Sequence, residues 1–224
     1  MRVEHFIGPR TTVNTFLLID EERKAAVVID PGERASSMEA LIAEEGLVLE
    51  DIVLTHGHVD HFGYAEAYRK QYGAAIWAPE KEKPLLEDSD LNLSVQLLGA
   101  AQTLLCDHYF KEGDRVSTMD LTVMETPGHT AGSVIFLRDS WMFSGDTLFQ
   151  GSCGRWDLPT GGMHVLFRSL ARIFELEGDY QVLPGHGPAT RLSEERAHSP
   201  MNRYITLQKQ WDKKKAEEAK NGKH

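Results

Sequence analysis

Hydrophobic residues in the first third of the chain gather in short runs that are typical of β-strands. Such runs occupy residues 15–20, 25–30, 51–56 and 74–79, and turn residues such as Pro31-Gly32 interrupt them. Their aliphatic content and length predict four strands, and the third of these is expected to be buried.

Elsewhere, apolar residues recur at intervals of three and four, which is the helical period. This spacing predicts a helix over residues 36–45, a second over residues 62–72, a third near 166–173 and a last one near 204–211. Each helix would bury a single apolar stripe and leave its other faces in solvent.

The second half of the chain again has strand-like runs, at residues 121–129, 133–139, 141–146 and 180–186. Residues 80–115 between the two halves are charged at first and then leucine-rich, and we expect a partly helical excursion there. Strand runs in both halves with helices between them predict an α/β fold of sheets covered by helices. We expect residues 1–224 to form a single domain that ends in a short helix and a frayed tail.

Composition narrows the class of protein. The chain has 224 residues, 41% of them hydrophobic, which is enough for one sizeable core. Its 24 basic and 34 acidic residues give a net charge of −10, which argues against binding to nucleic acid or to an anionic membrane. Only two cysteines are present and no apolar run approaches transmembrane length, so a cytoplasmic protein is expected.

The stretch "LTHGHVDHFGY" at residues 54–64 holds four ligand-type side chains within six positions, directly after a predicted strand. Other residues of the same types follow later strand runs, and the complete set is His56, His58, Asp60, His61, His129, Asp146 and His186. A lone histidine at a strand end is more often structural, but imidazoles and carboxylates in this number are typical of a hydrolytic metal centre. The spacing places His56 and His58 on one ion, with Asp60 and His61 within reach of a second ion about 3.5–4 Å away.

Four motifs carry a resemblance to a known family. "THGHVDH" resembles the T-H-x-H-x-D-H signature of the metallo-β-lactamase fold superfamily, and "TPGHTAGS", "FSGDTLF" and "LPGHG" match its other metal motifs in order. The resemblance covers nearly the whole chain. It implies a four-layer αβ/βα sandwich of the metallo-β-lactamase type, with a dinuclear site at one edge. It also implies that the first metal is held by His56, His58 and His129, that the second is held by Asp60, His61 and His186, and that Asp146 bridges them.

Residues 145–162, "GDTLFQGSCGRWDLPTGG", resemble the glyoxalase II group, the hydroxyacylglutathione hydrolases, and in particular their short bacterial relatives. True β-lactamases commonly carry a cysteine where this chain has Asp146, so antibiotic hydrolysis is not expected. In the glyoxalase II group a basic residue at the position of Arg155 helps to bind the glutathione carboxylate. Arg155 would serve either that purpose or a structural pairing with Asp157, and the sequence leaves both open.

The resemblance therefore predicts a metal-dependent thioesterase of the glyoxalase II type that uses a metal-bridging hydroxide, with Asp60 as a catalytic residue that holds the nucleophile in line. We expect two divalent ions as cofactors. Zinc is the expected metal, although iron or manganese would suit the same ligands. The expected partner is a small-molecule thioester, for which the resemblance suggests glutathione as the carrier, and neither nucleic acid nor membrane is expected.

Three other functions stay open at this stage. "GSCGR" resembles a turn of the persulfide dioxygenases, which would hold one iron with His56, His129 and Asp146. A lactone or phosphoester hydrolase of the same fold is a second alternative, and a non-catalytic metal-binding protein is a third. The larger glyoxalase II enzymes add a helical domain with further glutathione-binding residues, whereas only one helix and a tail fit after His186. The acyl group, the thiol carrier and the oligomeric state are therefore not fixed by the sequence.

Overall fold

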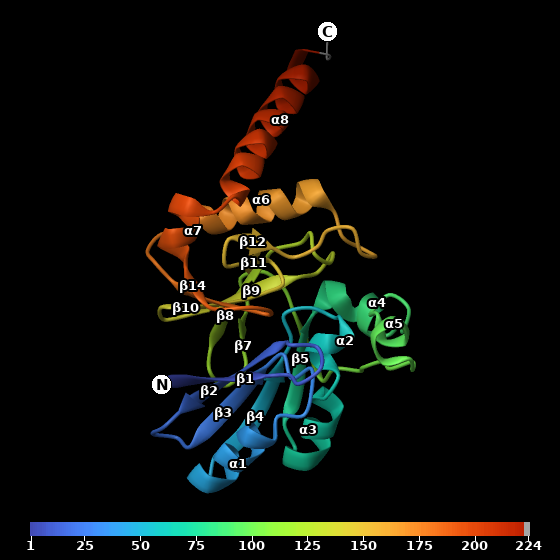
Figure 1. The fold of residues 1–224 in the computed structure, drawn as a ribbon, viewed down its shortest axis with the longest axis vertical. Helices are drawn as coiled ribbons and strands as arrows, with labels where there is room; N and C mark the ends of the chain where they lie inside the picture. Colours follow the sequence, from blue (N-terminus) through green and yellow to red (C-terminus); the bar gives the residue numbers. More distant parts are fainter. Residues whose placement is uncertain (222–224) are drawn as a thin grey trace.

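Two six-stranded sheets form the centre of the computed structural model, which describes residues 1–221 (Figure 1). In the first sheet, the strands lie side by side in chain order. They are antiparallel from β1 to β3 and parallel from β3 to β6. Their bounds are β1 (Arg2–Ile7), β2 (Asn14–Asp20), β3 (Ala25–Ile29), β4 (Val48–Val53), β5 (Ala75–Pro79) and β6 (His108–Phe110).

The second sheet is built from the later part of the chain in the order β14-β13-β10-β9-β8-β7, and only β10 and β13 pair in parallel. Its strands are β7 (Arg115–Val116), β8 (Leu121–Glu125), β9 (Val134–Arg138), β10 (Trp141–Gly145), β13 (Gln181–Pro184) and β14 (Thr190–Arg191). A separate two-stranded ribbon consists of β11 (Leu148–Phe149) and β12 (Ser152–Cys153).

Helices cover the outer faces of both sheets (Figure 1). In the first half these are α1 (Ser36–Glu45), α2 (Val59–Phe62), α3 (Ala65–Tyr72), the 3₁₀ turn η1 (Glu80–Glu82), α4 (Lys83–Leu86) and α5 (Ser94–Leu98). In the second half they are α6 (Met163–Phe174) and α7 (Leu192–His198), and the last helix, α8 (Met201–Asn221), starts against α6.

Strands that are apolar on both faces create the layers. In β2, Leu17 packs in a cluster with residues of α1 and α3, whereas its neighbour Leu18 faces the second sheet. On the far face of that sheet, Ile135 and Met142 pack against Leu166 of α6. Successive side chains of a strand point to opposite faces, so each sheet is buried on both sides. The arrangement is the expected four-layer αβ/βα sandwich, and this prediction is confirmed.

Several element predictions are confirmed as well, and others need correction. The helix over residues 36–45 has the predicted bounds in α1. The helix predicted over residues 62–72 is interrupted, because Tyr64 N–H donates to Pro31 O instead of continuing the helical ladder. The strand β1 was not predicted, and neither were β6, β7, β11, β12 and β14, which have only two or three residues and show no readable period.

The leucine-rich part of the 80–115 region contains only five helical residues, those of α5. Polar side chains there bind backbone groups that a longer helix would have used. Asn92 Oδ1 accepts from Ser94 N–H at 2.9 Å, and Ser94 Oγ accepts from Gln102 N–H at 2.9 Å. Short polar side chains compete with helical hydrogen bonds in this way.

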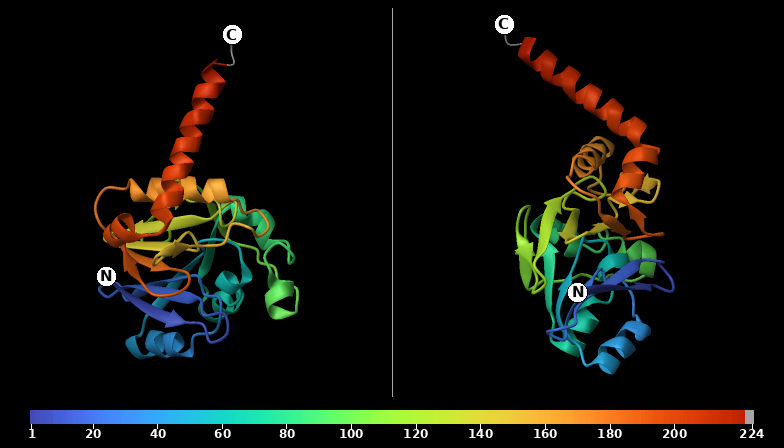
Figure 2. Two further views of the ribbon diagram at one scale, coloured as in Figure 1. Left: turned by 45° about the horizontal axis from the view of Figure 1, so that its top comes forward. Right: turned by 90° about the vertical axis from the view of Figure 1, so that its left-hand side faces the viewer.

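The last helix is longer than the sequence indicated. In both views of Figure 2, α8 extends away from the sandwich, and it continues to Asn221 where a short helix and a frayed tail were expected. Residues 213–219 consist of Lys, Glu and Ala, which are strong helix formers, and Lys215 pairs with Glu218 at 3.5 Å. Residues 222–224 of the expected tail lie outside the described residues. No helix within residues 1–221 is both long and apolar enough to cross a membrane.

Candidate metal centre

The seven side chains predicted as ligands lie together at one edge of the sandwich, where strands of both sheets end. They come from segments far apart in the chain: His56 and His58 follow β4, Asp60 and His61 lie in α2, His129 lies between β8 and β9, Asp146 follows β10, and His186 follows β13. Because these loops leave neighbouring strands at the same edge, the fold brings the side chains together.

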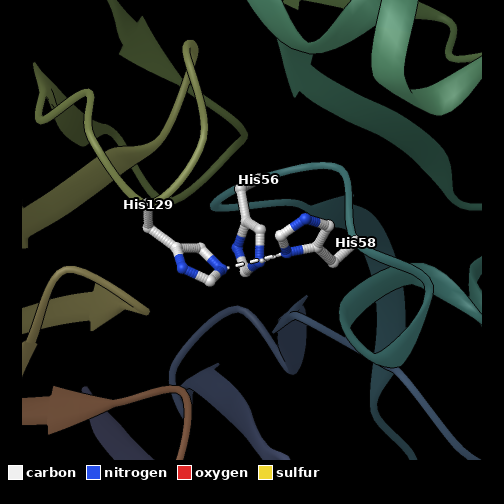
Figure 3. Close-up of side chains that lie close together, drawn as sticks. All are labelled: His56, His58 and His129. Carbon is white, nitrogen blue, oxygen red and sulfur yellow. Dashed lines mark hydrogen bonds between the residues drawn. The ribbon is translucent and has the colours of Figure 1, made fainter. Parts of the chain in front are cut away.

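Three imidazole rings point toward one another in the most buried part of this cluster (Figure 3). His58 Nδ1 lies 3.1 Å from His56 Nε2 and 2.9 Å from His129 Nε2. The three residues are at most 3% exposed. We call them the imidazole trio.

Hydrogen bonds on the outer side of the rings fix which nitrogen faces the centre. The single proton of the Thr55 hydroxyl is donated to Asp30 Oδ2 at 2.6 Å, so Thr55 Oγ1 accepts from His56 Nδ1–H at 3.1 Å. His129 Nδ1–H donates to the carbonyl oxygen of Arg155 at 2.8 Å. The Nε2 atoms of both histidines therefore direct lone pairs toward His58 Nδ1.

A second group lies beside the trio and is more open to solvent. Asp60 Oδ2 is 3.3 Å from His186 Nε2 and 4.0 Å from His61 Nε2. The side chain of His61 is fully buried, whereas that of His186 is 26% exposed. His61 is oriented from behind, since its Nδ1–H donates to Asp30 Oδ2 at 2.9 Å.

Asp146 lies between the two groups. Its Oδ1 is 3.4 Å from His61 Nε2, and its Oδ2 is 3.5 Å from His129 Nε2 and 3.8 Å from His186 Nε2. Gly185, which precedes His186, makes this approach possible, because a Cβ there would lie 2.3 Å from Asp146 Oδ1. One carboxylate thus faces ligand-type atoms of both groups.

The local charges differ between the two groups. Burial, followed by the neighbouring imidazoles, lowers the pKa of His56 well below its usual range and that of His58 to about 3. Burial also acts to lower the pKa of His61, but the carboxylates of Asp146 and Asp30 outweigh it and raise that pKa well above the usual range. His56 and His58 are therefore neutral at pH 7, which is the form in which imidazole binds a metal.

The residues fit a bound cation. His58 Nδ1 contacts the lone pairs of His56 Nε2 and His129 Nε2, and it carries at most one proton. In at least one of these two contacts, therefore, two nitrogen lone pairs face each other with no proton between them. His61 Nε2 and Asp146 Oδ1 are buried, 3.4 Å apart, and have no hydrogen-bond partner within residues 1–221. Facing lone pairs of buried imidazoles, as in the trio, are costly unless a cation satisfies them, and a bound cation would also replace the proton that the raised pKa places on His61. Three overlapping groups have the separations of a metal site: His56, His58 and His129; His56, His61 and Asp146; and Asp60, His61 and His186.

Comparison with known families agrees with this geometry. Residues 8–186, well over half of the chain, match the family model described as the metallo-beta-lactamase superfamily. The chain belongs to this superfamily. The resemblance read from the sequence motifs is therefore confirmed.

Two curated relatives are similar over most of their length. The chain is 34% identical to "Hydroxyacylglutathione hydrolase GloC" of Haemophilus influenzae, over 84% of this chain and 91% of the relative. It is also 34% identical to "Probable metallo-hydrolase YqgX" of Bacillus subtilis, over 87% of this chain and 93% of the relative. Family membership and the ligand cluster together identify the protein as a metallo-hydrolase.

Solved structures of the superfamily have the same fold. "BLEG-1 B3 metallo-beta-lactamase" superposes with a TM-score of 0.82 at 33% identity and covers 92% of this chain and all of that one. TTHA1623 "in a di-iron-bound form" superposes with a TM-score of 0.76 at 34% identity, and the match covers 87% of this chain and 96% of that one. ETHE1 from Myxococcus xanthus superposes with a TM-score of 0.73 at 27% identity, and the match covers 93% of this chain and 90% of that one. These neighbours support the fold and a site for divalent metal ions, and they are named for different kinds of chemistry.

A cavity of about 280 Å³ borders both the imidazole trio and the group of Asp60, His61 and His186. It is lined by His58, Asp60, His129, Asp146 and His186, and also by Leu93, Leu97, Phe149, Cys153, Gly154, Arg155 and Leu158. Arg155 therefore lines the candidate site, and its role in binding substrate stays a prediction. Its guanidinium also donates to both carboxylate oxygens of Asp157, at 2.9 and 3.0 Å, and both side chains are exposed. In this position Arg155 pairs with Asp157 and also lies where it could bind a substrate carboxylate, so the two expectations do not exclude each other.

Three polar residues that support the site were not assigned a role from the sequence. Asp30 orients His61 and Thr55, and Asn14 Nδ2 donates to Pro184 O and Gly187 O on either side of His186. Both residues stand in motifs that resemble the superfamily, "VVIDPG" and "NTFLLID", so a signal was present. Glu82 lies in the charged run "EKEKP", which gives no hint of its buried position.

Proposed function

We propose that this metallo-hydrolase is a thioesterase of the hydroxyacylglutathione hydrolase type with a dinuclear centre. The observation that carries the proposal is the position of Asp146 between the imidazole trio and the group of Asp60, His61 and His186. The similarity to a relative named hydroxyacylglutathione hydrolase supports the choice of substrate. The two cysteines, Cys106 and Cys153, are both unpaired thiols, and we keep the cytoplasm as the expected compartment.

In this proposal the trio holds one ion, Asp60, His61 and His186 hold the other, and Asp146 contacts both. Two divalent ions at such a site lower the pKa of water toward neutrality and polarise a carbonyl oxygen. We propose zinc, and the di-iron neighbour makes iron the alternative to measure.

Asp60 has the geometry to position a nucleophilic water. Its side chain is 17% exposed and borders the cavity, and its carboxylate lies at the more open group. Burial acts to raise the pKa of Asp60, but His61 and the hydrogen bond from His186 outweigh it and lower that pKa. Asp60 is therefore ionised at neutral pH and would accept a hydrogen bond from the attacking water or hydroxide, which holds the oxygen lone pair in line with the carbonyl carbon.

Arg155 is suited to bind the thiol carrier, which is the leaving group of a thioester. A thiolate is a good leaving group, so the lack of an assigned general acid does not prevent the reaction. Arg155 lies at the edge of the cavity and would bind a carboxylate of the thiol carrier by exchanging it for Asp157.

The mononuclear alternative uses fewer of these residues. A persulfide dioxygenase would hold one iron with His56, His129 and Asp146, and it would leave the group of Asp60, His61 and His186 without a part in metal binding. The presence of that second complete group favours the hydrolase.

Paired assays on one purified sample test the proposal. We expect release of free thiol from S-lactoylglutathione and no oxygen uptake with glutathione persulfide. Oxygen uptake without thiol release would contradict the proposal and favour the dioxygenase. Activity toward lactones or phosphoesters alone would keep the hydrolase and reject the thioester.

An Asp60→Asn variant tests the role of Asp60. Loss of a positioned base costs about 10²–10⁴-fold in kcat, and we expect a loss in that range when activity is expressed per bound metal, because Asp60 is also a proposed ligand. A variant that keeps both metals and full thioesterase activity would disprove this role.

A further inference from the structure

One wall of the cavity is made by two leucines that belong to no metal-binding motif. Leu93 and Leu97 border the same cavity as His58, Asp60 and Asp146. We call Leu93 and Leu97 the leucine wall. Phe149 and Leu158 border the cavity from the other half of the chain. Apart from the ligand-type residues, Arg155 is the only charged side chain among residues 1–221 that lines it.

Leu93 is held in an unfavourable backbone conformation. Its φ of 66° and ψ of 13° lie in the left-handed region, which a side chain with a Cβ rarely adopts. Such conformations persist where the surroundings impose them, and they concentrate at functional sites.

A buried polar network imposes this conformation and ties it to the metal centre. Asn92 is fully buried, and its carbonyl accepts from Val59 N–H at 2.9 Å, directly after the candidate ligand His58. Asn92 Nδ2 donates to Gln102 O at 2.8 Å, and Gln102 Nε2 donates to Gly63 O at 2.8 Å. The segment is therefore bound at both ends to the loop that carries Asp60, and the leucine wall has a fixed position relative to it.

The wall continues to the protein surface as an apolar face. Leu97 lines the cavity and is 52% exposed, so the outer end of the leucine wall lies at the protein surface. Apolar side chains that line a cavity beside a few converging polar groups are typical of ligand-binding sites. The cavity volume of about 280 Å³ is close to the lower end of known ligand sites, so a longer chain would extend along this exposed face.

We propose that the leucine wall binds an apolar acyl chain, so that the preferred substrates are thioesters of short to medium alkanoic acids. The inference rests on the proposed thioesterase function and specifies its acyl side. The acyl chain lies against Leu93 and Leu97, and the charged end of the carrier is directed to Arg155, which lines the same cavity. Each additional methylene that is buried against the wall should then raise kcat/KM about fourfold.

A series of acyl groups on one carrier tests the inference with the metal-loaded protein. S-acetyl-, S-butanoyl- and S-hexanoylglutathione differ only in apolar length, and S-lactoylglutathione adds a polar hydroxyl. We expect kcat/KM to rise at least tenfold from acetyl to hexanoyl in the wild type. We also expect hexanoyl to exceed lactoyl.

Two variants and a matched control assign the effect to the wall. Leu97→Ser removes apolar surface that is already half exposed, and Leu93→Gly places the residue that best tolerates a positive φ, so both are expected to fold. Each should reduce the hexanoyl-to-acetyl ratio by about tenfold, and the melting temperature should stay within a few degrees of wild type. Val48→Ser is the control, because Val48 is 60% exposed at the opposite end of β4, and it should keep the wild-type ratio.

The outcomes separate this inference from the proposed function. Thiol release with equal kcat/KM for acetyl and hexanoyl would overturn the apolar acyl site and leave the thioesterase intact. A wild-type ratio in both folded leucine variants would also overturn it. Absence of thiol release from every thioester would reject the proposed function, and the inference with it.

Discussion

At the level of single residues, Glu82 joins the two loops that carry the imidazole trio. It is 1% exposed, and its two oxygens accept from different loops: Oε2 from Gly57 N–H at 2.7 Å and Oε1 from Gly132 N–H at 2.6 Å. Burial, only partly offset by these bonds, raises the pKa of Glu82. The carboxylate thus sets the distance between the loop of His56 and His58 and the loop of His129.

We expect Glu82→Gln to loosen this connection. An amide offers one acceptor, so its NH₂ group would face one of the two backbone N–H donors. The loss of a bond to a buried charged group should cost about 1.5–3 kcal/mol of stability, and metal affinity should fall about 10- to 100-fold. Chelator competition and thermal unfolding measure the two effects.

Glu80→Gln is the matched control for this change, because Glu80 lies in the same 3₁₀ turn but is exposed. It should leave metal affinity unchanged. Equal metal affinity in wild type and Glu82→Gln would show that Glu82 does not position the ligand loops.

Glu33 provides a pH-dependent contribution to stability. Its buried carboxylate accepts from Thr11 N–H at 2.6 Å and from Arg10 N–H at 3.2 Å. Burial acts to raise the pKa of Glu33, but these hydrogen bonds and the charge of Arg10 outweigh it and lower that pKa below 4.5. A depressed folded-state pKa stabilises the protein above the unfolded-state value, and this stability is lost as the pH falls through the folded-state value.

Glu33→Gln should therefore be less stable than wild type at pH 7, by about 1–3 kcal/mol. The two proteins should converge below about pH 4, close to the ordinary pKa of a glutamate. Denaturant unfolding between pH 3 and pH 7 measures this. Parallel stability curves over that range would contradict it.

At the level of elements, the loop after β3 packs directly against the helical turn that carries Asp60. A Cβ on Gly32 would lie 1.5 Å from the carbonyl oxygen of Asp60, so only glycine permits the contact. We expect Gly32→Ala to displace α2 and to lower kcat about 10²-fold, the usual effect of a misplacement near 1 Å.

Gly162→Ala provides the comparison, since a Cβ there meets Val165 only at an ordinary 3.5 Å. It should keep nearly full activity. A Gly32→Ala protein with wild-type kcat would show that the position of α2 does not limit the reaction.

The elements that were predictable from the sequence are those with a local signal. α1 has its apolar stripe and β2 its aliphatic run, and both lie where their patterns predict. The helix predicted over residues 62–72 is interrupted because Pro31, distant in sequence, binds the N–H of Tyr64. No local pattern reveals such a contact.

The same distinction applies to the candidate site. The residues at strand ends could be found because each ligand-type residue follows an apolar run in a recognisable motif. Glu82 and Leu93 could not, since their positions depend on loops that meet only in the folded chain. Their roles follow from burial and backbone geometry, which a sequence does not display.

At the level of the whole molecule, the candidate site lies where the two sheets meet, and it is built from residues of both. The trio combines His56 and His58 of the first sheet's edge with His129 of the second, and Asp146 and His61 meet across the same seam. Metals bound there would connect the two halves of the sandwich.

Removal of metal should consequently lower the stability of the whole sandwich. A ligand present at a thousand times its Kd stabilises the folded state by about 4 kcal/mol, so chelation should lower the melting temperature by several degrees. Calorimetry with and without a chelator measures this, and readdition of metal should restore the transition. An unchanged melting temperature after verified metal removal would contradict it.

The central claim is that two ions act together in hydrolysis, and titration of metal-free protein with zinc tests it most directly. Thiol release from a thioester is followed as zinc is added, with the bound metal per chain measured on the same samples. We predict that activity rises until two equivalents are bound and then stays constant. Full activity at one bound equivalent, unchanged by a second, would contradict a dinuclear thioesterase.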